Sequence, residues 1–380
     1  MKIVAAPNAF KGTLTAREAA QAMEAGIRRV LPDADVALVP VADGGDGLVE
    51  VAHHARGGEL LEYTVSGPRR EPVTAAIALV PEARSVAIEM ALASGLALLP
   101  EDRRDPSVTT SYGTGELIAA ALDLGAERIE IGIGGSATND GGVGIASALG
   151  VRFLDREGAS VEPVGGALAS IASIDPSGLD PRARKARLEV VCDVDNPLLG
   201  PRGAARVFAP QKGASPEQVE TLEAGLANLA DVIERSLGVD VRNLPGGGAA
   251  GGAGAGLHAF LGAELRKGID VVLDLVGLPE KIRGADLVLT GEGRLDEQTA
   301  FDKAPAGVGK AARAAGVRCY AIAGMVDGDA EALRACGIDR VFSLCSDAVS
   351  PEESMTRAAH HVERTTEEAM HEFLRETTAS

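Results

Sequence analysis

The 380-residue sequence contains no tryptophan, and its aromatic residues amount to only 3% of the chain. Hydrophobic residues nevertheless make up 46%, so the core has to be built from Val, Leu, Ile and Ala side chains. Such a composition is typical of α/β proteins, in which parallel strands are buried on both faces. The length suggests two or three domains and is ample to bury a core.

Cysteine and histidine are also scarce, with four and six residues respectively. The cysteines show no CxxC spacing and the histidines form no HxH or HExxH pattern, so no zinc site is indicated. We expect free buried thiols, as in a reducing compartment. Neither a signal-peptide pattern nor an 18-residue apolar run is present, which predicts a soluble cytoplasmic protein with no membrane partner.

Basic residues are outnumbered, because 37 Lys and Arg stand against 55 Asp and Glu and give a net charge of −18. An acidic surface repels nucleic-acid phosphates and anionic lipids, so neither is expected as a partner. Anionic small molecules are not excluded, since the field of a local site can differ from the average. The oligomeric state is left open between monomer and homodimer.

Both ends of the chain alternate strand-like and helix-like segments. Near the start, KIVAAP and DVALVPV predict strands on either side of a helix at 15–30. Thr15 and Glu18 form a capping-box pair at the start of that helix. From 285 onward the same alternation returns, with ADLVLTGEG, VRCYAIAG and DRVFSL as strands. This pattern is typical of βαβ units and a parallel sheet.

The middle of the chain does not show this alternation of strands and helices. Residues 59–90 predict three strands in a meander, and Ser215 with Gln218 marks the start of a long helix. We therefore predict an α/β fold with a doubly wound, Rossmann-like domain made from both chain ends and a mixed α/β domain inserted between them. These domains are expected at 1–60 with 285–380, and at 61–284.

The segment IEIGIGGSATNDGG ends a strand-like run in a glycine-rich loop. Gly132, Gly134 and Ala137 fit the G-x-G-x-x-A pattern of dinucleotide sites. Asp155 lies at roughly the distance expected for the ribose-binding acid. A helix that began at once would, however, contain several glycines that each cost about 1 kcal/mol. We expect a longer loop with the helix starting near Gly142, and an NAD-dependent dehydrogenase is a minor alternative.

Glycines, carboxylates and a few lysines gather in the loops that follow predicted strands, where ligands bind in open parallel sheets. Glycine lets backbone N–H groups approach phosphate oxygens, and one or two carboxylates can hold Mg²⁺. Lysine neutralises a transferred phosphoryl group, and a carboxylate can accept the proton of an attacking hydroxyl. The mixture favours phosphoryl transfer. There is no GxxxxGK[ST], HRD or DFG motif, so P-loop and protein-kinase chemistry are excluded.

The strings APNAFKG, ADGGDG, IGIGGSATNDGG, CDVDNPLLGPRGA, FAPQKGA and LTGEGRLDEQT span nearly the whole chain. In this order they resemble the class I glycerate kinases. The resemblance implies ATP- and Mg²⁺-dependent phosphorylation of D-glycerate, usually at the 2-hydroxyl group, to give 2-phosphoglycerate. It also implies two α/β domains with the active site in the cleft between them.

The loops and the resemblance together suggest roles for individual residues. Asp193 is the expected general base, with Lys11 and Asp195 as further catalytic residues. Glycerate is expected to contact Asn8, Asp43, Asp46, Arg294 and Lys303. ATP is expected to contact Gly134, Gly135, Ser136, Thr138, Asn139, Lys212, Gly246, Gly247, Gly291 and Glu292. Asp195 and Asp296 are the expected metal ligands.

Simpler interpretations stay open for some of these residues. Asp195 could cap a turn, because Asn196 and Pro197 follow it, and Arg294 could pair with Asp296 or Glu292. The glycine run that begins at 246 could be a flexible hinge.

The chain departs from the family pattern at Asn8, Leu48 and Phe301. The loop that usually reads PDSFKG is PNAFKG, ADGGEGT is ADGGDGL, and a usual His-Gly is Phe-Asp. Other activities therefore stay open beside the phosphorylation of glycerate to 2-phosphoglycerate. They are phosphorylation of a related small hydroxy acid, glycerate 3-phosphorylation and non-catalytic nucleotide binding.

Overall fold

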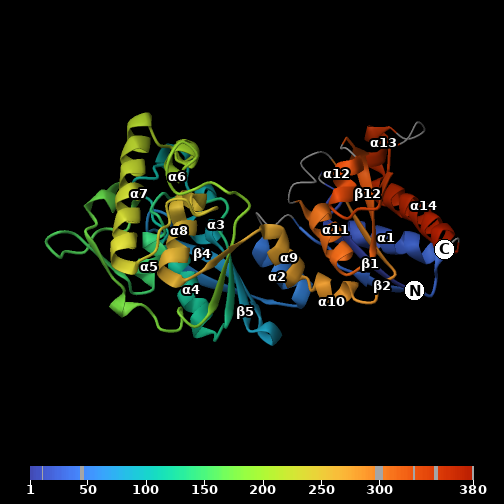
Figure 1. Cartoon of the computed structure of the whole chain (residues 1–380), viewed down its shortest axis with the longest axis horizontal. Helices are drawn as coiled ribbons and strands as arrows, with labels where there is room; N and C mark the ends of the chain where they lie inside the picture. Colours follow the sequence, from blue (N-terminus) through green and yellow to red (C-terminus); the bar gives the residue numbers. More distant parts are fainter. Residues whose placement is uncertain (11, 43–46, 296–302, 328–329, 346–349, 379–380) are drawn as a thin grey trace. The chain divides into compact units, whose positions relative to one another are not determined.

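The computed structural model describes residues 1–10, 12–42, 47–295, 303–327, 330–345 and 350–378. The chain divides into two compact units (Figure 1). Unit 1 consists of Met1–Asp43 and Ile269–Ser380, and unit 2 is the continuous segment Gly44–Gly268. Each unit encloses a hydrophobic core of its own.

Unit 1 is built on a parallel sheet with the strand order β13-β12-β11-β1-β2. The first strand of the chain lies inside this sheet, because β1 pairs with β11 on one side and with β2 on the other. The register places Ile3 opposite Leu287. The strands are β1 (Lys2–Pro7), β2 (Asp35–Leu38), β11 (Leu287–Leu295), β12 (Arg318–Val326) and β13 (Arg340–Ser343).

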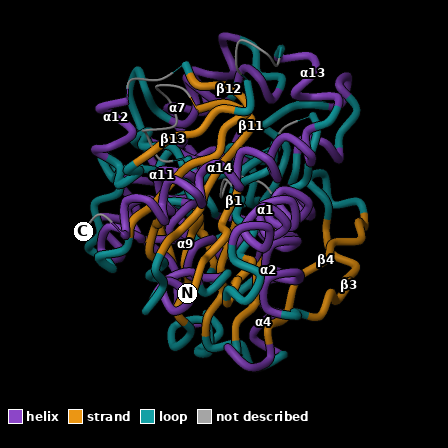
Figure 2. The backbone as a smooth tube through the Cα atoms, turned by 90° about the vertical axis from the view of Figure 1, so that its right-hand side faces the viewer, coloured by secondary structure: helices purple, strands orange, loops and turns teal. Residues whose placement is uncertain are grey.

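The helices of unit 1 cover both faces of this sheet. The connection from β1 leads outward to β2, whereas the connections from β11 lead the other way to β12 and β13, so right-handed crossovers place their helices on opposite faces. Helices α1 and α14 pack against each other, and α11 packs against β11 and β12 (Figure 2). The helices are α1 (Ala16–Val30), α9 (Gly268–Leu275), α10 (Leu278–Ile282), α11 (Ala304–Ala314), α12 (Ala330–Ala335), α13 (Pro351–Thr356) and α14 (Ala358–Thr378).

This strand order is the doubly wound order 2-1-3-4-5, which confirms the predicted fold of this part of the chain. The direction of winding changes between β1 and β11. Ligands of open α/β sheets bind at this switch point, outside the carboxyl ends of the strands.

Unit 2 holds a mixed sheet with the order β10-β9-β6-β5-β4-β3. The predicted meander is confirmed, since β3, β4 and β5 pair antiparallel, whereas β5, β6, β9 and β10 run parallel. The strands are β3 (Glu59–Ser66), β4 (Pro72–Val80), β5 (Ser85–Glu89), β6 (Arg128–Gly132), β9 (Arg187–Val191) and β10 (Glu264–Arg266), with β7 (Arg152–Leu154) and β8 (Ser173–Asp175) in a separate two-stranded antiparallel sheet.

The core of unit 2 is formed largely by aliphatic side chains from the sheet and from the helices packed on it. Ile129 and Ile131 of β6 contribute from the sheet, in agreement with a core that lacks tryptophan. The helices are α2 (Leu48–Arg56), α3 (Met90–Ser94), α4 (Tyr112–Asp123), α5 (Val143–Ala148), α6 (Ala204–Phe208), α7 (Pro216–Leu237) and α8 (Ala249–Leu261).

The boundaries between the units differ from those expected from the sequence. Helix α2 packs against β4 and β5, so residues 48–60 belong to unit 2 instead of the Rossmann-like domain. Helix α10 packs against α11, and Ile269 of α9 lies against Gly307 of α11, so residues 269–284 belong to unit 1. Local sequence signals do not report these long-range contacts.

The two predicted helix starts are confirmed. Thr15 and Glu18 form the capping box of α1, and Ser215 with Gln218 forms that of α7. All four cysteines are free, although Cys192 and Cys345 are only half-buried. Among the residues that the structure describes, no helix is both long and apolar enough to cross a bilayer.

Candidate active site

The first pocket lies in unit 2, at the carboxyl ends of the neighbouring parallel strands β6 and β9. The loops that leave these strands, 133–136 and 192–194, form two of its walls. The cavity has a volume of about 360 Å³. We call it the unit 2 pocket; it is also lined by Leu96, Phe208, Gln211, Lys212, Ala249 and Ala250.

A glycine turn forms the first of these walls. Gly134 and Gly135 line the pocket, and Gly135 has a left-handed backbone with a φ of +66°. Two backbone hydrogen bonds fix this turn. The Leu96 N–H donates to Gly135 O at 2.8 Å, and the Ala137 N–H donates to Ser94 O at 2.9 Å. A backbone fixed in this way can present its N–H groups to an anion with little reorganisation.

No helix follows the glycine turn directly, because Gly141 and Gly142 are left-handed and α5 begins only at Val143. The predicted start near Gly142 is confirmed. Asp155 caps a turn by accepting the N–H groups of Glu157 and Ala159. This geometry does not favour the dinucleotide interpretation.

Lys212 reaches the pocket from a short 3-10 helix, Pro210–Lys212, and is almost completely buried. Its Nζ donates to Ser136 Oγ at 2.8 Å and to Thr138 O at 2.7 Å. Burial lowers the pKa of Lys212 to about 7, and the negative charge of Asp140 opposes that fall. An ammonium group placed here, next to a glycine turn, is suited to neutralising a phosphate.

Asp140, which was not among the predicted site residues, organises the loop behind the pocket. Its Oδ2 accepts the N–H and the hydroxyl of Ser111 at 2.7 and 2.8 Å and the Gly144 N–H at 3.3 Å, and its Oδ1 accepts the Gly142 N–H at 3.1 Å. Burial raises the pKa of Asp140, and these hydrogen bonds offset part of the rise. The only sequence signal was its position in the glycine-rich loop.

The two aspartates after β9 lie in different environments. Asp193 lines the pocket, and its Oδ1 accepts the Gly268 N–H at 2.8 Å. Asp195 is 79% exposed and pairs with Arg202 at 2.7 Å. The geometry therefore brings Asp193, but not Asp195, together with Lys212.

The remaining predicted nucleotide contacts in unit 2 lie behind the pocket. Thr138 and Asn139 are fully buried and do not line it, although the Thr138 carbonyl positions Lys212. Gly246 and Gly247 form the turn that leads into α8, whereas Ala249 and Ala250 reach the cavity. Ala250 has a φ of +53°, which is strained for alanine and which no sequence pattern indicated.

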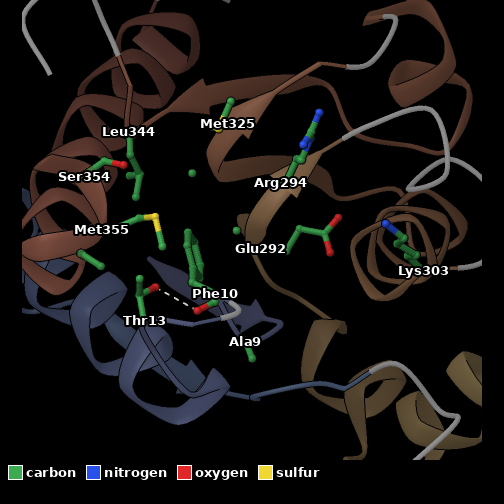
Figure 3. A pocket seen from close by; sticks show the side chains of 13 residues that line it. Ala9, Phe10, Thr13, Glu292, Arg294, Lys303, Met325, Leu344, Ser354 and Met355 are labelled. Atoms are coloured by element: carbon green, nitrogen blue, oxygen red, sulfur yellow. Dashed lines mark hydrogen bonds between the residues drawn. The ribbon is translucent and has the colours of Figure 1, made fainter. Parts of the chain in front are cut away.

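The second pocket lies in unit 1, at the carboxyl ends of β1, β11 and β12, next to the switch point (Figure 3). Its volume is about 320 Å³. We call it the unit 1 pocket. One side, the charged wall, consists of Glu292, Arg294 and Lys303. The other side carries the apolar wall, which consists of Phe10, Met325, Leu344 and Met355, together with the hydroxyl residues Thr13 and Ser354.

The charged wall is held by β11 and the start of α11. Arg294 pairs with Asp327 at 2.6 Å, a different partner from the two considered in the sequence. Lys303 is the N-cap residue of α11, and Glu292 is largely buried. Positive side chains and a helix N-terminus both favour an anionic ligand.

Asn8 and Gly291 are close to this pocket but do not line it. The Asn8 N–H donates to Gly291 O at 2.8 Å, and Asn8 Oδ1 accepts the Ala9 N–H at 2.7 Å. A Cβ at Gly291 would overlap the carbonyl oxygen of Ile322 on β12, so this glycine serves close packing of the strands.

Some positions singled out in the sequence lie outside the described residues, namely Lys11, Asp43, Asp46, Asp296 and Phe301. Leu48 is described. It is buried at the start of α2, where a Cβ added to Gly132 would come into van der Waals contact with it. Packing in unit 2 therefore accounts for leucine at this position.

The chain's residues fit a Mg²⁺ ion only in part. Within the described ranges no group of three or more His, Cys, Asp or Glu side chains could hold a metal. Mg²⁺ is, however, often held by one or two carboxylates together with phosphate oxygens. Asp193 is the carboxylate that lines the unit 2 pocket, where it could lie beside such an ion, whereas Asp195 is paired with Arg202.

Comparison with known proteins shows that nearly the whole chain is similar to glycerate kinases. A model of the glycerate kinase family matches residues 3–374. The chain is 51% identical to a glycerate kinase of Bacillus subtilis (strain 168), with 96% of each chain covered. It is 47% identical to the glycerate 2-kinase of Escherichia coli (strain K12), with 95% of each chain covered.

A solved structure assigned as glycerate kinase 2 from Salmonella typhimurium LT2 is also similar. The match has a TM-score of 0.87 at 47% sequence identity, and it covers 100% of this chain and 99% of that chain.

Proposed function

Because the chain belongs to the glycerate kinase family, we propose that it transfers the γ-phosphoryl group of ATP to the 2-hydroxyl group of D-glycerate, with Mg²⁺. The protein is a phosphotransferase with an alcohol group as acceptor. The family resemblance supports the choice of the 2-hydroxyl, and so does the name of the Escherichia coli relative.

The unit 2 pocket carries the proposal, because it combines a buried lysine with a glycine turn. Lys212 and the N–H groups of Gly134 and Gly135 are assigned to the phosphates of ATP. In phosphoryl transfer the protein acts mainly by positioning and by neutralising charge. Bound Mg²⁺ would supply further positive charge to the phosphates, and Asp296 stays the predicted carboxylate ligand for it.

Asp193 is assigned as the general base that accepts the proton of the attacking hydroxyl. Its carboxylate lines the pocket, and the Gly268 N–H fixes the orientation of that carboxylate. A positioned base of this kind contributes about 10²–10⁴-fold to a rate.

The unit 1 pocket is assigned to the acceptor. Arg294 and Lys303 on the charged wall would hold the glycerate carboxylate, for which the planar guanidinium group of arginine is well matched. The roles predicted for Lys11, Asp43, Asp46 and Asp296 stay predictions, because these residues lie outside the described ranges. The cytoplasmic location and the monomeric or homodimeric state also stay predictions.

A coupled ADP-release assay with glycerate, hydroxypyruvate, tartronate and sugar acids tests the proposal, with NMR to identify the phosphorylated product of glycerate. We expect fastest turnover with D-glycerate and formation of 2-phosphoglycerate. Preference for another acid, or 3-phosphoglycerate as the product, would favour one of the alternative kinases.

Two further outcomes separate the non-kinase alternatives. ATP binding without ADP release from any acid would favour a non-catalytic nucleotide-binding protein. Retention of NADH would favour a dehydrogenase.

A further inference from the structure

The unit 1 pocket offers more apolar surface than glycerate can use. Every carbon of this three-carbon acid carries an oxygen, yet one side of the cavity carries the apolar wall. Figure 3 shows the Met355 side chain directed toward Phe10 and Leu344, whereas Glu292, Arg294 and Lys303 lie on the other side. A volume of about 320 Å³ reaches the range of sites for much larger ligands.

The two walls meet between neighbouring strands. Arg294 of β11 and Met325 of β12 are register partners in the parallel sheet. Neighbouring strands lie about 4.8 Å apart, and paired residues of this kind share a face. Arg294 pairs with Asp327, two residues after Met325, so a carboxylate that shared its guanidinium group would lie at the end of β12, near Met325.

The apolar wall has a rigid base and an adaptable rim. Phe10 and Leu344 are only 2% and 1% exposed, so their positions are fixed by packing. Met355 is 55% exposed on the short helix α13. An unbranched thioether side chain adapts to ligands of different shape.

We propose that the acceptor site also takes 2-hydroxy acids that carry an alkyl group in place of the 3-hydroxyl, such as 2-hydroxybutyrate and 2-hydroxyisovalerate. The carboxylate would lie on the charged wall and the alkyl group on the apolar wall. This inference rests on the proposed function. A hydroxyl buried against apolar surface loses its hydrogen bonds to water, whereas an alkyl group there leaves water favourably.

Phosphoryl transfer to such an acid forms and breaks the same bonds as phosphoryl transfer to glycerate. The 2-hydroxyl oxygen forms the new bond to the γ-phosphorus, and the bond from that phosphorus to the β–γ bridging oxygen breaks. ADP leaves with the electron pair, and the hydroxyl proton passes to the general base. No further reactant is needed.

The first experiment compares D-glycerate with 2-hydroxybutyrate, 2-hydroxyisovalerate and tartronate in the ADP-release assay, with the phosphorylated product of each acid identified by NMR. We expect kcat/KM for 2-hydroxybutyrate to lie within about tenfold of the value for glycerate. Tartronate, which carries a second carboxylate toward the apolar wall, is expected to be the poorest acceptor.

Two variants of the apolar wall test whether the alkyl group of the acid binds there. Met355→Gln and Met325→Gln are expected to lower the ratio of kcat/KM for 2-hydroxybutyrate to that for glycerate, by about fourfold for each methylene group of the ligand that no longer packs on an apolar side chain. Val326→Gln is the matched control. Val326 follows Met325 on β12, is exposed and does not line this pocket, so the ratio should not change.

Two results would overturn the inference while the proposed function stands. In one, the enzyme forms 2-phosphoglycerate but does not phosphorylate either alkyl acid. In the other, Met355→Gln raises KM for ATP and leaves the ratio unchanged, which assigns the apolar wall to the nucleotide base. Absence of turnover with every acid, or formation of 3-phosphoglycerate, would instead contradict the proposed function.

Discussion

At the scale of single residues, Lys212 combines a charge with almost complete burial. Desolvation lowers its pKa from 10.5 to about 7. Between these two values the unfolded chain binds more protons at this site than the folded chain does. This residue therefore makes the stability of the free protein rise with pH from about 7 to about 10.5.

Lys212→Met removes this pH dependence together with the phosphate contact. We expect the melting temperature of the variant, relative to wild type, to fall as the pH rises from 7 to 10, with kcat/KM reduced at least about 100-fold. The check is a series of thermal melts across that range. Lys185→Met, at an exposed lysine of the same unit, is the control. Parallel curves for wild type and Lys212→Met would contradict the assignment.

Nucleotide binding should also change the protonation of Lys212. A phosphate next to the ammonium group favours its charged form, so Mg·ATP binding is expected to take up close to one proton at about pH 8 and little at pH 6. Calorimetry in buffers of different ionisation enthalpy measures this uptake. If the uptake persists in Lys212→Met, it arises from another group.

Asp193→Asn tests the general base with little risk to the fold. An asparagine Oδ1 can still accept the Gly268 N–H, so the loop should keep its shape. We expect kcat to fall about 10²–10⁴-fold while the affinity for ATP changes little. Steady-state kinetics and a binding titration check both parts. Near-normal turnover would exclude Asp193 as the base.

At the scale of elements, helix α8 and its C-cap residue offer a matched pair of glycines. Gly251 and Gly262 both have left-handed backbones, with φ of +67° and +69°. A Cβ at Gly251 would overlap the carbonyl oxygen of Thr138, which positions Lys212, whereas a Cβ at Gly262 would meet nothing within 4 Å.

Gly251→Ala and Gly262→Ala should therefore behave differently. Gly262→Ala carries only the left-handed strain, about 1–2 kcal/mol of unfolding free energy. Gly251→Ala is expected to cost clearly more and also to raise KM for ATP. Denaturant unfolding and steady-state kinetics measure the two effects. Equal losses of stability with unchanged KM would show that α8 does not support the pocket.

Features that depend on residues close together in the sequence could be predicted from it. The capping boxes at Thr15 and Ser215 depend on residues three positions apart, so a short pattern reveals them. The loop that ends at Gly142 was predictable because glycines disfavour a helix.

The geometry of the site depends on longer-range contacts. Lys212 donates a hydrogen bond to Ser136, which is 76 positions away in the sequence. Arg294 pairs with Asp327, which follows the next strand of the sheet. The charge pattern suggested these residues for the site. It did not reveal that Asp195 pairs with Arg202 or that Asp140 organises the loop, because both depend on side-chain placement in three dimensions.

At the scale of the whole molecule, unit 2 is a continuous segment with a core of its own. We therefore expect residues 44–268 to fold when produced alone and to bind Mg·ATP through the unit 2 pocket, without phosphorylating glycerate. A cooperative thermal melt that shifts upward with Mg·ATP checks this expectation. The same fragment with Lys212→Met is the control, and an equal shift there would place the nucleotide elsewhere.

Unit 1 differs in kind, because β1 lies between β2 and β11 and pairs Ile3 with Leu287. On a ribosome that adds about 5–20 residues per second, about 15–60 s separate the emergence of these two strands. Throughout that time the edge of β1 that pairs with β11 has no partner strand. A nascent chain arrested after unit 2 would keep that edge open, and it would be recognised by chaperones as unfinished even though more than half of its residues were already folded.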